Sequence, residues 1–315
     1  MVMKVLHNDR KVTLPDFLIV GAMRSGTTSL YVYLNNHRAI FMPSLKEPQF
    51  FSYLGEKCSP HPPEIRSTPW NLEDYVRLFK HARPGQIIGE ASTSYLYIYQ
   101  RTQKNIMAIY GEQVTNLKII GILRNPIERA WSIYTLKKQG GGWKKDFFTI
   151  AREFEIEGSQ YQYYNFLASG LFFDQVKAYL EIFPLTRFFL FEELISEPDR
   201  VVRECLNFVG VTDVSLPPGI GKVHNLSGVA RSMAVAPIYR FLFERNQTKN
   251  LLKVFIPQVI REGVKRWVGY RVVKKEPVPS EVKEYLLPKY AADLRRLADL
   301  LQNERQRKII EGWLK

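Results

Sequence analysis

Short, mostly apolar runs alternate with longer amphipathic stretches along most of the chain. Apolar runs too short for helices predict strands at 17–20, 40–42, 87–90, 117–123 and 187–191. Apolar residues at helical spacing predict helices at 72–79, 98–115, 126–138, 172–183, 201–209 and from 280 onward, the last kinked or divided at Pro288. Residues 1–14 are expected to form a polar lead-in. This alternation predicts an α/β fold in which helices cover both faces of a parallel sheet.

Length and composition suit one such domain across residues 1–315. A chain of 315 residues can bury a large core, and two cysteines provide neither a disulfide framework nor a metal-ligand cluster. No segment approaches the roughly 20 apolar residues of a membrane-spanning helix, so we expect a cytoplasmic protein. The formal net charge of +14 predicts anionic partners without identifying them.

Residues 231–275 carry much of that charge. Eleven lysines and arginines against two glutamates give this segment a net charge of +9. Apolar residues at mixed helical spacing run through it, so we interpret it as a basic helical cap inserted into the domain. The cap either packs on the body with solvated charges or forms a docking surface for an acidic partner or an anionic membrane.

The stretch from Phe17 to Leu30 predicts a binding site for a phosphate or sulfate group. An apolar strand is followed by Gly21-x-x-x-x-Gly26 and then by the start of a helix, so backbone N–H groups point at whatever lies above the turn. The lysine that follows the second glycine in nucleoside triphosphatases is Thr27 here, and the nearest cation, Arg24, precedes that glycine. A packed strand-to-helix connection is the alternative interpretation.

A second stretch also has the features of an anion site. The strand at 117–123 ends at Arg124, and Pro126 is placed to open a helix that has Ser132 two turns in. A guanidinium and a hydroxyl in this position can bind a second phosphate. A surface ion pair is the alternative for Arg124.

Together these stretches resemble the sulfotransferases that use 3′-phosphoadenosine 5′-phosphosulfate (PAPS). They are most similar to the heparan-sulfate type and its bacterial relatives, including the sulfotransferase domains of polyketide and olefin synthases, and the similarity extends through 46–51, 89–96 and 183–211. The resemblance implies a P-loop-like sulfotransferase fold with PAPS as donor, adenosine 3′,5′-bisphosphate (PAP) as product and no required metal. It also implies donor contacts at Arg24, Ser25, Gly26, Thr27, Thr28, Ser29, Arg124 and Ser132.

On the acceptor side, the resemblance implies that Glu47 is the catalytic base. Glu47 lies in a Lys-Glu-Pro-Gln-Phe-Phe run, in which a carboxylate near a strand end can take a proton from an acceptor hydroxyl. Phe50 and Phe51 are candidate acceptor contacts. The alternative is a solvated Lys46–Glu47 pair beside two core phenylalanines.

Glu90 is a further candidate near the acceptor. It is expected to orient Arg24, to act as a second carboxylate at the acceptor, or to pair with an arginine in the core. Relatives often follow this glutamate with Lys-Thr-Pro, where this chain has Ala91-Ser92-Thr93. That difference weakens the inference of a sulfated-polysaccharide acceptor.

A basic, glycine-containing segment follows at 222–231. Many sulfotransferases close such a loop over the 3′-phosphate, which implies donor contacts at Gly228 and Arg231. His224 is a candidate second base or acceptor contact, and a hydrogen-bonded loop histidine is the alternative.

We therefore predict an enzyme that transfers the sulfuryl group of PAPS to an acceptor hydroxyl. The predicted acceptor is a hydroxyacyl chain on an acidic carrier protein, with an intracellular sugar or lipid as the alternative. No nucleic-acid partner is expected, and any peripheral membrane contact would use 231–275. A P-loop kinase would need the missing lysine, and a non-catalytic basic docking protein would leave both anion motifs unexplained.

Overall fold

The computed structural model describes residues 3–7, 10–56, 69–139, 142–156, 165–221, 229–230, 273–274 and 276–315. These residues divide into two compact units. Unit 1 draws on Met1–Asn125, Leu171–His224 and Ala291–Lys315, and unit 2 draws on Pro126–Gly170 and Asn225–Tyr290. Each unit is described by itself.

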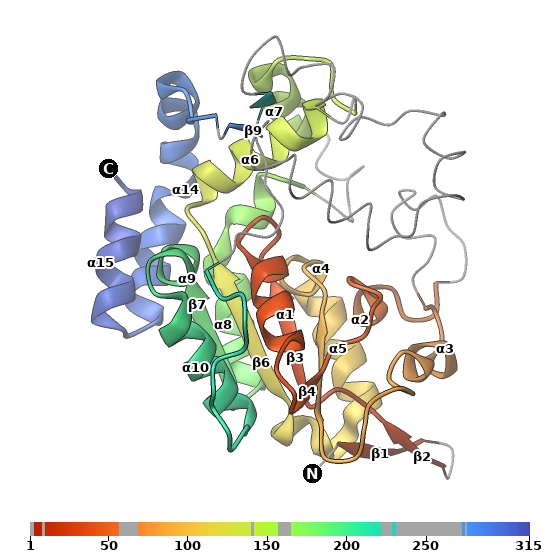
Figure 1. Ribbon diagram of the computed structural model, residues 1–315. Helices are drawn as coiled ribbons and strands as arrows, with labels where there is room; N and C mark the ends of the chain where they lie inside the picture. The colour runs from red at the N-terminus through yellow and green to blue at the C-terminus, as the bar shows by residue number, and fades with distance from the viewer. Residues whose placement is uncertain are drawn as a thin grey trace. The chain divides into compact units, whose positions relative to one another are not determined.

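Unit 1 is built on a five-stranded parallel sheet with the strand order β4-β5-β3-β6-β7 (Figure 1). Its strands are β3 (Phe17–Gly21), β4 (Ile40–Phe41), β5 (Ile87–Ala91), β6 (Lys118–Leu123) and β7 (Thr186–Leu190). Each falls on one of the predicted apolar runs, because a strand buried on both faces is apolar without alternation. The predicted α/β fold with a parallel sheet is therefore confirmed.

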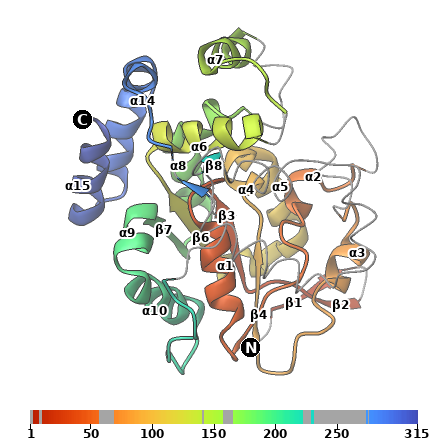
Figure 2. The same cartoon turned by 45° about the horizontal axis from the view of Figure 1, so that its top comes forward.

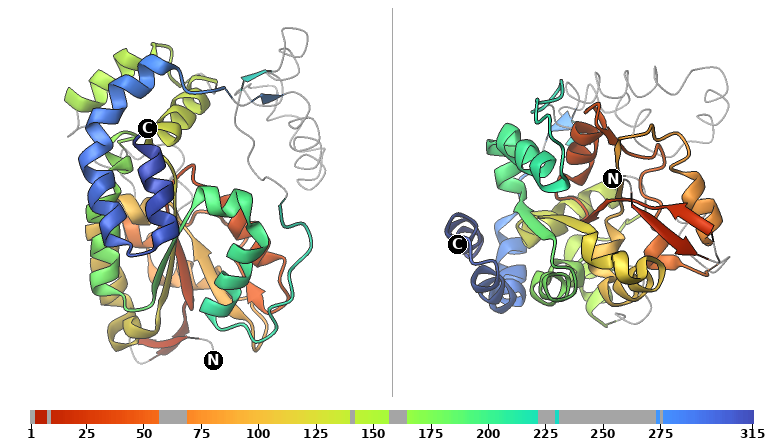
Figure 3. Two further views of the ribbon diagram at one scale, coloured as in Figure 1. Left: turned by 90° about the vertical axis from the view of Figure 1, so that its left-hand side faces the viewer. Right: turned by 90° about the horizontal axis from the view of Figure 1, so that it is seen from below.

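Helices cover both faces of this sheet. α1 and α10 lie on one face, and α5 and α8 lie on the other (Figure 3). Buried residues of α1 and α10 pack with residues of β3 and β6 in one hydrophobic cluster. The described residues of unit 1 outside α14 form the helical segments α1 (Thr27–Asn35), α2 (Phe50–Tyr53), α3 (Leu72–Arg77), α4 (Ser94–Tyr97), α5 (Tyr99–Tyr110), η2 (Gly111–Asn116), α8 (Phe172–Ile182), α9 (Phe191–Ser196), α10 (Pro198–Val209) and α15 (Glu304–Trp313).

An antiparallel hairpin, β1 (Lys4–His7) and β2 (Arg10–Thr13), precedes the sheet. The buried carboxylate of Asp16 accepts the backbone N–H of Met3 at 2.7 Å and that of Ile88 at 2.7 Å. One side chain thus ties the chain before the hairpin to the start of β5. Only a polar lead-in was expected over residues 1–14, and this hairpin was not predicted.

Unit 2 contains α6 (Pro126–Gln139), α7 (Phe147–Ile156), η3 (Ala168–Gly170) and the antiparallel pair β8 (Val229–Ala230) and β9 (Val273–Lys274). Aromatic rings fill its interior, with Phe166 lying 5.0 Å from both Trp143 and Phe154 between ring centroids.

Helix α14 (Ser280–Leu300) belongs to unit 2 up to Tyr290 and to unit 1 from Ala291. A kink or a division was expected at Pro288, and the helix continues through that residue without a division. Within the described part of the chain, every helix is either too short or too polar to span a bilayer. Apart from β9, the predicted cap at 231–275 lies outside the described residues, and one domain over 1–315 stays a prediction.

Gly89 in β5 lies against two side chains of the core. A Cβ at this position would lie 2.1 Å from the Phe17 ring and 2.5 Å from the Met42 sulfur. We expect Gly89→Ala to lower the free energy of unfolding by about 1–3 kcal/mol, because the core must shift to admit the methyl group. Urea unfolding of the purified protein measures this change.

Gly312 in α15 provides the matched control. A Cβ there meets no atom within 4 Å, so Gly312→Ala should leave stability unchanged or slightly raised, as expected for alanine in a helix. Equal losses in the two variants would contradict the packing explanation.

Candidate active site

The turn between β3 and α1 has the geometry of an anion-binding loop. It lies at the carboxyl edge of the sheet, the edge that comes forward in Figure 2. Gly26 precedes α1 with φ +91°, a conformation that favours glycine, and a Cβ there would lie 2.9 Å from Leu194 and 3.1 Å from Phe191. The N-cap residue Gly26 has no side chain with which to cap α1. The first N–H groups of the helix point into the turn, where an anion can accept them.

Ser25 is the second observation that fits an anion in this turn. Its side chain is fully buried, and its hydroxyl has no hydrogen-bond partner among the described residues. A buried hydroxyl without a partner is costly, and an anion held by the turn would satisfy it. The residues present therefore fit the phosphosulfate end of the predicted donor.

Arg124 joins the second motif to this turn. It follows β6 directly, its side chain is 5% exposed, and its guanidinium donates to the carbonyl oxygen of Arg24 at 3.0 Å. The same guanidinium lies 4.6 Å from the centroid of the Phe191 ring. The structure thus brings together Arg124 and the turn, which are 100 residues apart in sequence.

Ser132 lies within α6, which begins at Pro126 as predicted. Its side chain is buried in unit 2, whereas Arg124 belongs to unit 1. Joint binding of one phosphate by Arg124 and Ser132 stays a prediction.

Glu47 is held by a neighbour that the sequence did not predict. One carboxylate oxygen accepts both the backbone N–H of Thr93 at 3.0 Å and its hydroxyl at 2.6 Å, and the other accepts the Lys46 ammonium at 3.2 Å. The Glu47 side chain remains 27% exposed. The carbonyl oxygen of Thr93 lies 3.4 Å from the position that a Cβ on Gly21 would occupy. Thr93 therefore lies between Glu47 and the start of the anion-binding turn.

Glu90 is fully buried and bound by hydroxyl groups. Its carboxylate accepts Ser92 at 2.6 Å, Tyr95 at 2.7 Å and Tyr75 at 3.2 Å. The described partners of Glu90 are thus hydroxyl groups rather than an arginine. Desolvation by burial raises the pKa of Glu90 from 4.5 to about 7, while the three hydrogen bonds oppose that rise. Its proposed place at the acceptor stays untested.

Phe50 and Phe51 lie in the core with no exposed surface. Phe50 stacks on Tyr75 with ring centroids 4.1 Å apart, and Phe51 meets the same ring edge-on at 5.3 Å. Direct acceptor contact requires exposed ring surface, so the structure supports the core alternative for these two residues. Their burial anchors the segment that contains Glu47 to the core.

The remaining site predictions concern residues that the structure does not describe. His224, Gly228 and Arg231 lie outside the described residues. Across the described ranges, no three His, Cys, Asp or Glu side chains are grouped to hold a metal ion. Independence of a metal stays a prediction.

Thr93, Ser92 and the two tyrosines are the residues that sequence reasoning missed. Ser92 and Thr93 follow β5 in a polar run, and polar residues after a parallel strand are the available signal for a site. Tyr75 and Tyr95 reach Glu90 from α3 and α4, and no local pattern points to that contact.

A family model for the sulfotransferase domain matches residues 14–216. The matched segment contains the anion-binding turn, Glu47, Glu90 and Arg124 on one edge of a parallel sheet. The chain therefore belongs to the sulfotransferase domain family, and the resemblance expected from the sequence is confirmed.

Curated relatives agree with this assignment. The chain is 29% identical to heparan sulfate glucosamine 3-O-sulfotransferase 6 of Mus musculus, over 64% of the chain and 53% of that protein. It is 22% identical to the membrane-associated sulfotransferase kil1 of Dictyostelium discoideum, over 64% of the chain and 57% of that protein. The chain thus spans about half the length of the curated relatives it matches.

A solved structure extends the similarity over nearly the whole chain. The sulfotransferase from Alicyclobacillus acidocaldarius superposes with a TM-score of 0.68 at 27% identity, covering 96% of this chain and 100% of that one. The similarity to a sulfotransferase therefore extends beyond the family-matched segment.

The buried Glu90 gives a prediction for stability against pH. The folded protein holds a proton on Glu90 up to about pH 7, whereas the unfolded chain releases it near 4.5, so stability should fall as pH rises between these values. At about 1.4 kcal/mol for each pKa unit, the fall amounts to roughly 3 kcal/mol. Glu90→Gln should remove this fall, measured by urea unfolding at about pH 5 and pH 8.

Glu112→Gln, at an exposed position, should keep the pH dependence of the parent protein. A constant difference between Glu90→Gln and the parent at both pH values would contradict a raised pKa at Glu90.

Proposed function

We propose that the chain transfers the sulfuryl group of PAPS to the hydroxyl of an acceptor, releasing PAP. The hydrogen bond from Arg124 to the Arg24 carbonyl supports this most directly. It unites two anion-binding motifs at the carboxyl edge of a parallel sheet, where ligands of such sheets bind. A donor with anionic groups at both ends suits two such motifs.

In the proposed reaction, the turn holds the end of the donor that reacts. Arg24, Thr27, Thr28 and the N–H groups at the start of α1 would stabilise charge on the sulfuryl oxygens and on the leaving phosphate. Arg124 would bind the 3′-phosphate as a charge-assisted donor. Ser25 would donate its buried hydroxyl to the anion in the turn.

Glu47 is the proposed base. The acceptor oxygen bonds to sulfur while the bond from sulfur to the 5′-phosphate oxygen breaks, and Glu47 takes the proton that the hydroxyl loses. The Glu47 carboxylate is partly exposed and can contact an acceptor, whereas Glu90 is fully buried in the core. Two hydrogen bonds from Thr93 fix its orientation.

Two acceptor classes have separate support. The name of the heparan sulfate relative favours a glucosamine hydroxyl of a polysaccharide, or more broadly a sugar. The +9 charge of residues 231–275 favours a hydroxyacyl chain on an acidic carrier protein, and a lipid hydroxyl suits the same charge. Sulfation assays with labelled PAPS against sugar, carrier-bound and lipid hydroxyls distinguish these classes.

Donor binding separates the proposal from the kinase and docking-protein alternatives. PAP should raise the unfolding temperature of the protein, and ATP with magnesium should not. A shift with ATP and magnesium alone would favour a kinase, and no shift with either nucleotide would leave only the docking function.

Glu47→Gln and Arg24→Ala should each reduce turnover at least about tenfold, because removal of a preorganised charged group costs that much or more. Turnover is measured with labelled PAPS and the acceptor found in the panel. Glu112→Gln and Arg77→Ala change exposed charges of the same kind and should keep the parent rate. Parent-like turnover in Glu47→Gln would move the base to another residue.

Thr93→Val removes the hydroxyl bond to Glu47 and keeps the backbone bond. We expect turnover to fall about tenfold or more with PAP affinity unchanged, because a hydrogen bond to a charged group contributes about 1.5–3 kcal/mol. Thr115→Val, at an exposed threonine, is the control. Equal turnover in the two variants would show that the Thr93 hydroxyl does not orient the base.

A further inference from the structure

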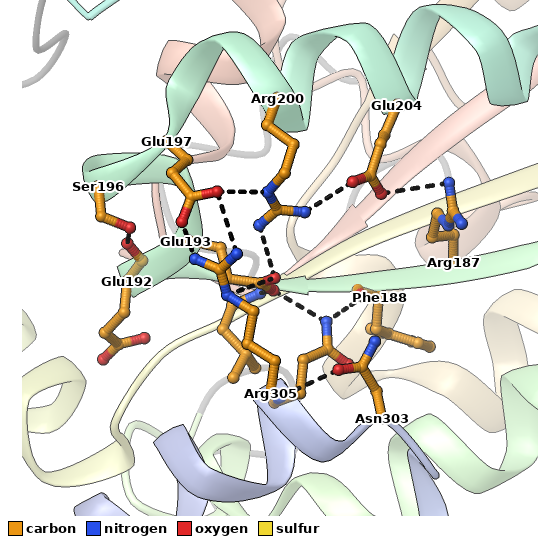
Figure 4. A network of polar contacts seen from close by, with 12 residues as sticks. Arg187, Phe188, Glu192, Glu193, Ser196, Glu197, Arg200, Glu204, Asn303 and Arg305 are labelled. Carbon is orange, nitrogen blue, oxygen red and sulfur yellow. Dashed lines mark hydrogen bonds and ion pairs between the residues drawn. The ribbon is translucent and has the colours of Figure 1, made fainter.

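We propose that Glu193, held by Arg200, Arg305 and Gln306, positions the donor-binding turn through α9. These four residues are called the Glu193 network. Glu193, Arg200 and Arg305 are labelled in Figure 4. The inference rests on the proposed function, because the turn and Arg124 are taken as the donor site. None of the four residues belongs to that site, so they are positioning residues.

Helix α9 packs against the turn and against Arg124. Its first residue, Phe191, lies under the Arg124 guanidinium, which in turn donates to the Arg24 carbonyl. Phe191 and Leu194 also occupy the space next to Gly26 into which a side chain at that position would extend. Any shift of α9 would therefore displace both the turn and Arg124.

Glu193 fixes where α9 begins. Its carboxylate accepts the backbone N–H of Leu190 at 2.9 Å, directly before Phe191. The Glu193 side chain is 3% exposed, so its carboxylate must be stabilised by protein partners in place of water. Arg200 of α10 donates to the other carboxylate oxygen at 2.8 Å.

The remaining partners come from α15. Gln306 donates from one amide nitrogen to Glu193 at 2.9 Å and to the Phe188 carbonyl of β7 at 3.0 Å. Arg305 lies 4.0 Å from Glu193 and donates to Glu197 at 3.0 Å. Trp313 adds a hydrogen bond to Glu192 at 3.0 Å. Helix α15 is therefore bonded to α9 at two successive residues.

Helix α15 lies outside the segment that matches the family model, which ends at residue 216. The turn and Arg124 lie within that segment. Helix α15 therefore contributes to the donor affinity of the turn and Arg124, although it contacts neither of them.

PAP binding by the full-length protein tests this inference without an acceptor. Isothermal titration calorimetry gives the PAP dissociation constant of the parent protein, Gln306→Leu and Glu193→Gln, at a temperature where each is folded by circular dichroism. We expect the two variants to bind PAP about three- to tenfold more weakly, the range usual for residues that couple to a site. Lys308→Ala, whose exposed ammonium pairs with Glu304 on the same helix, should bind as the parent does.

The dissociation constant separates positioning from support of the fold. A merely structural role would lower the unfolding temperature of the variants and leave their PAP affinity within twofold of the parent, which would overturn the inference while the proposed function stands. A parent protein that fails to bind PAP would overturn both. If Glu193→Gln does not fold, Gln306→Leu and the half-exposed Arg305→Ala decide by the same criterion.

Discussion

The hydrogen bond between the Arg124 guanidinium and the Arg24 carbonyl is the interaction on which the candidate site depends. It forms because β3 and β6 are adjacent and parallel, so the turn after one strand and the arginine after the other reach the same edge. A charged donor on a backbone carbonyl is stronger than a neutral pair. The arginine of one anion motif thereby also holds the backbone of the other.

Two carboxylates near this edge have opposite surroundings. Glu47 is partly exposed and bound by an ammonium and by Thr93, whereas Glu90 is buried beneath three hydroxyls. Ser92 links the two regions, since its hydroxyl donates to Glu90 and accepts the backbone N–H of Gln49 at 2.8 Å. The buried carboxylate thus supports the segment that contains the exposed one.

Local sequence signals predicted the sheet, most helices and the two anion motifs. An apolar run indicates a buried strand without reference to the rest of the chain, and the residues of each motif are close together in the sequence. The partners of the carboxylates were not predictable, because Glu47 and Thr93 are 46 residues apart, and Glu193 and Gln306 are 113 apart. Such contacts depend on which helix ends the tertiary fold brings together. The β1–β2 hairpin was missed because its strands are short and largely polar.

The position of Gln306 bears on how this protein can be shortened. A truncated chain that stopped at the end of the family-matched segment would keep Arg200 and lose Gln306 and Arg305. Glu193 would then face solvent or an empty space where α15 had been, and the Phe188 carbonyl would lose its amide donor. The family segment taken alone is therefore not the smallest complete unit of this protein, and α15 belongs in any fragment chosen for crystallisation or assay.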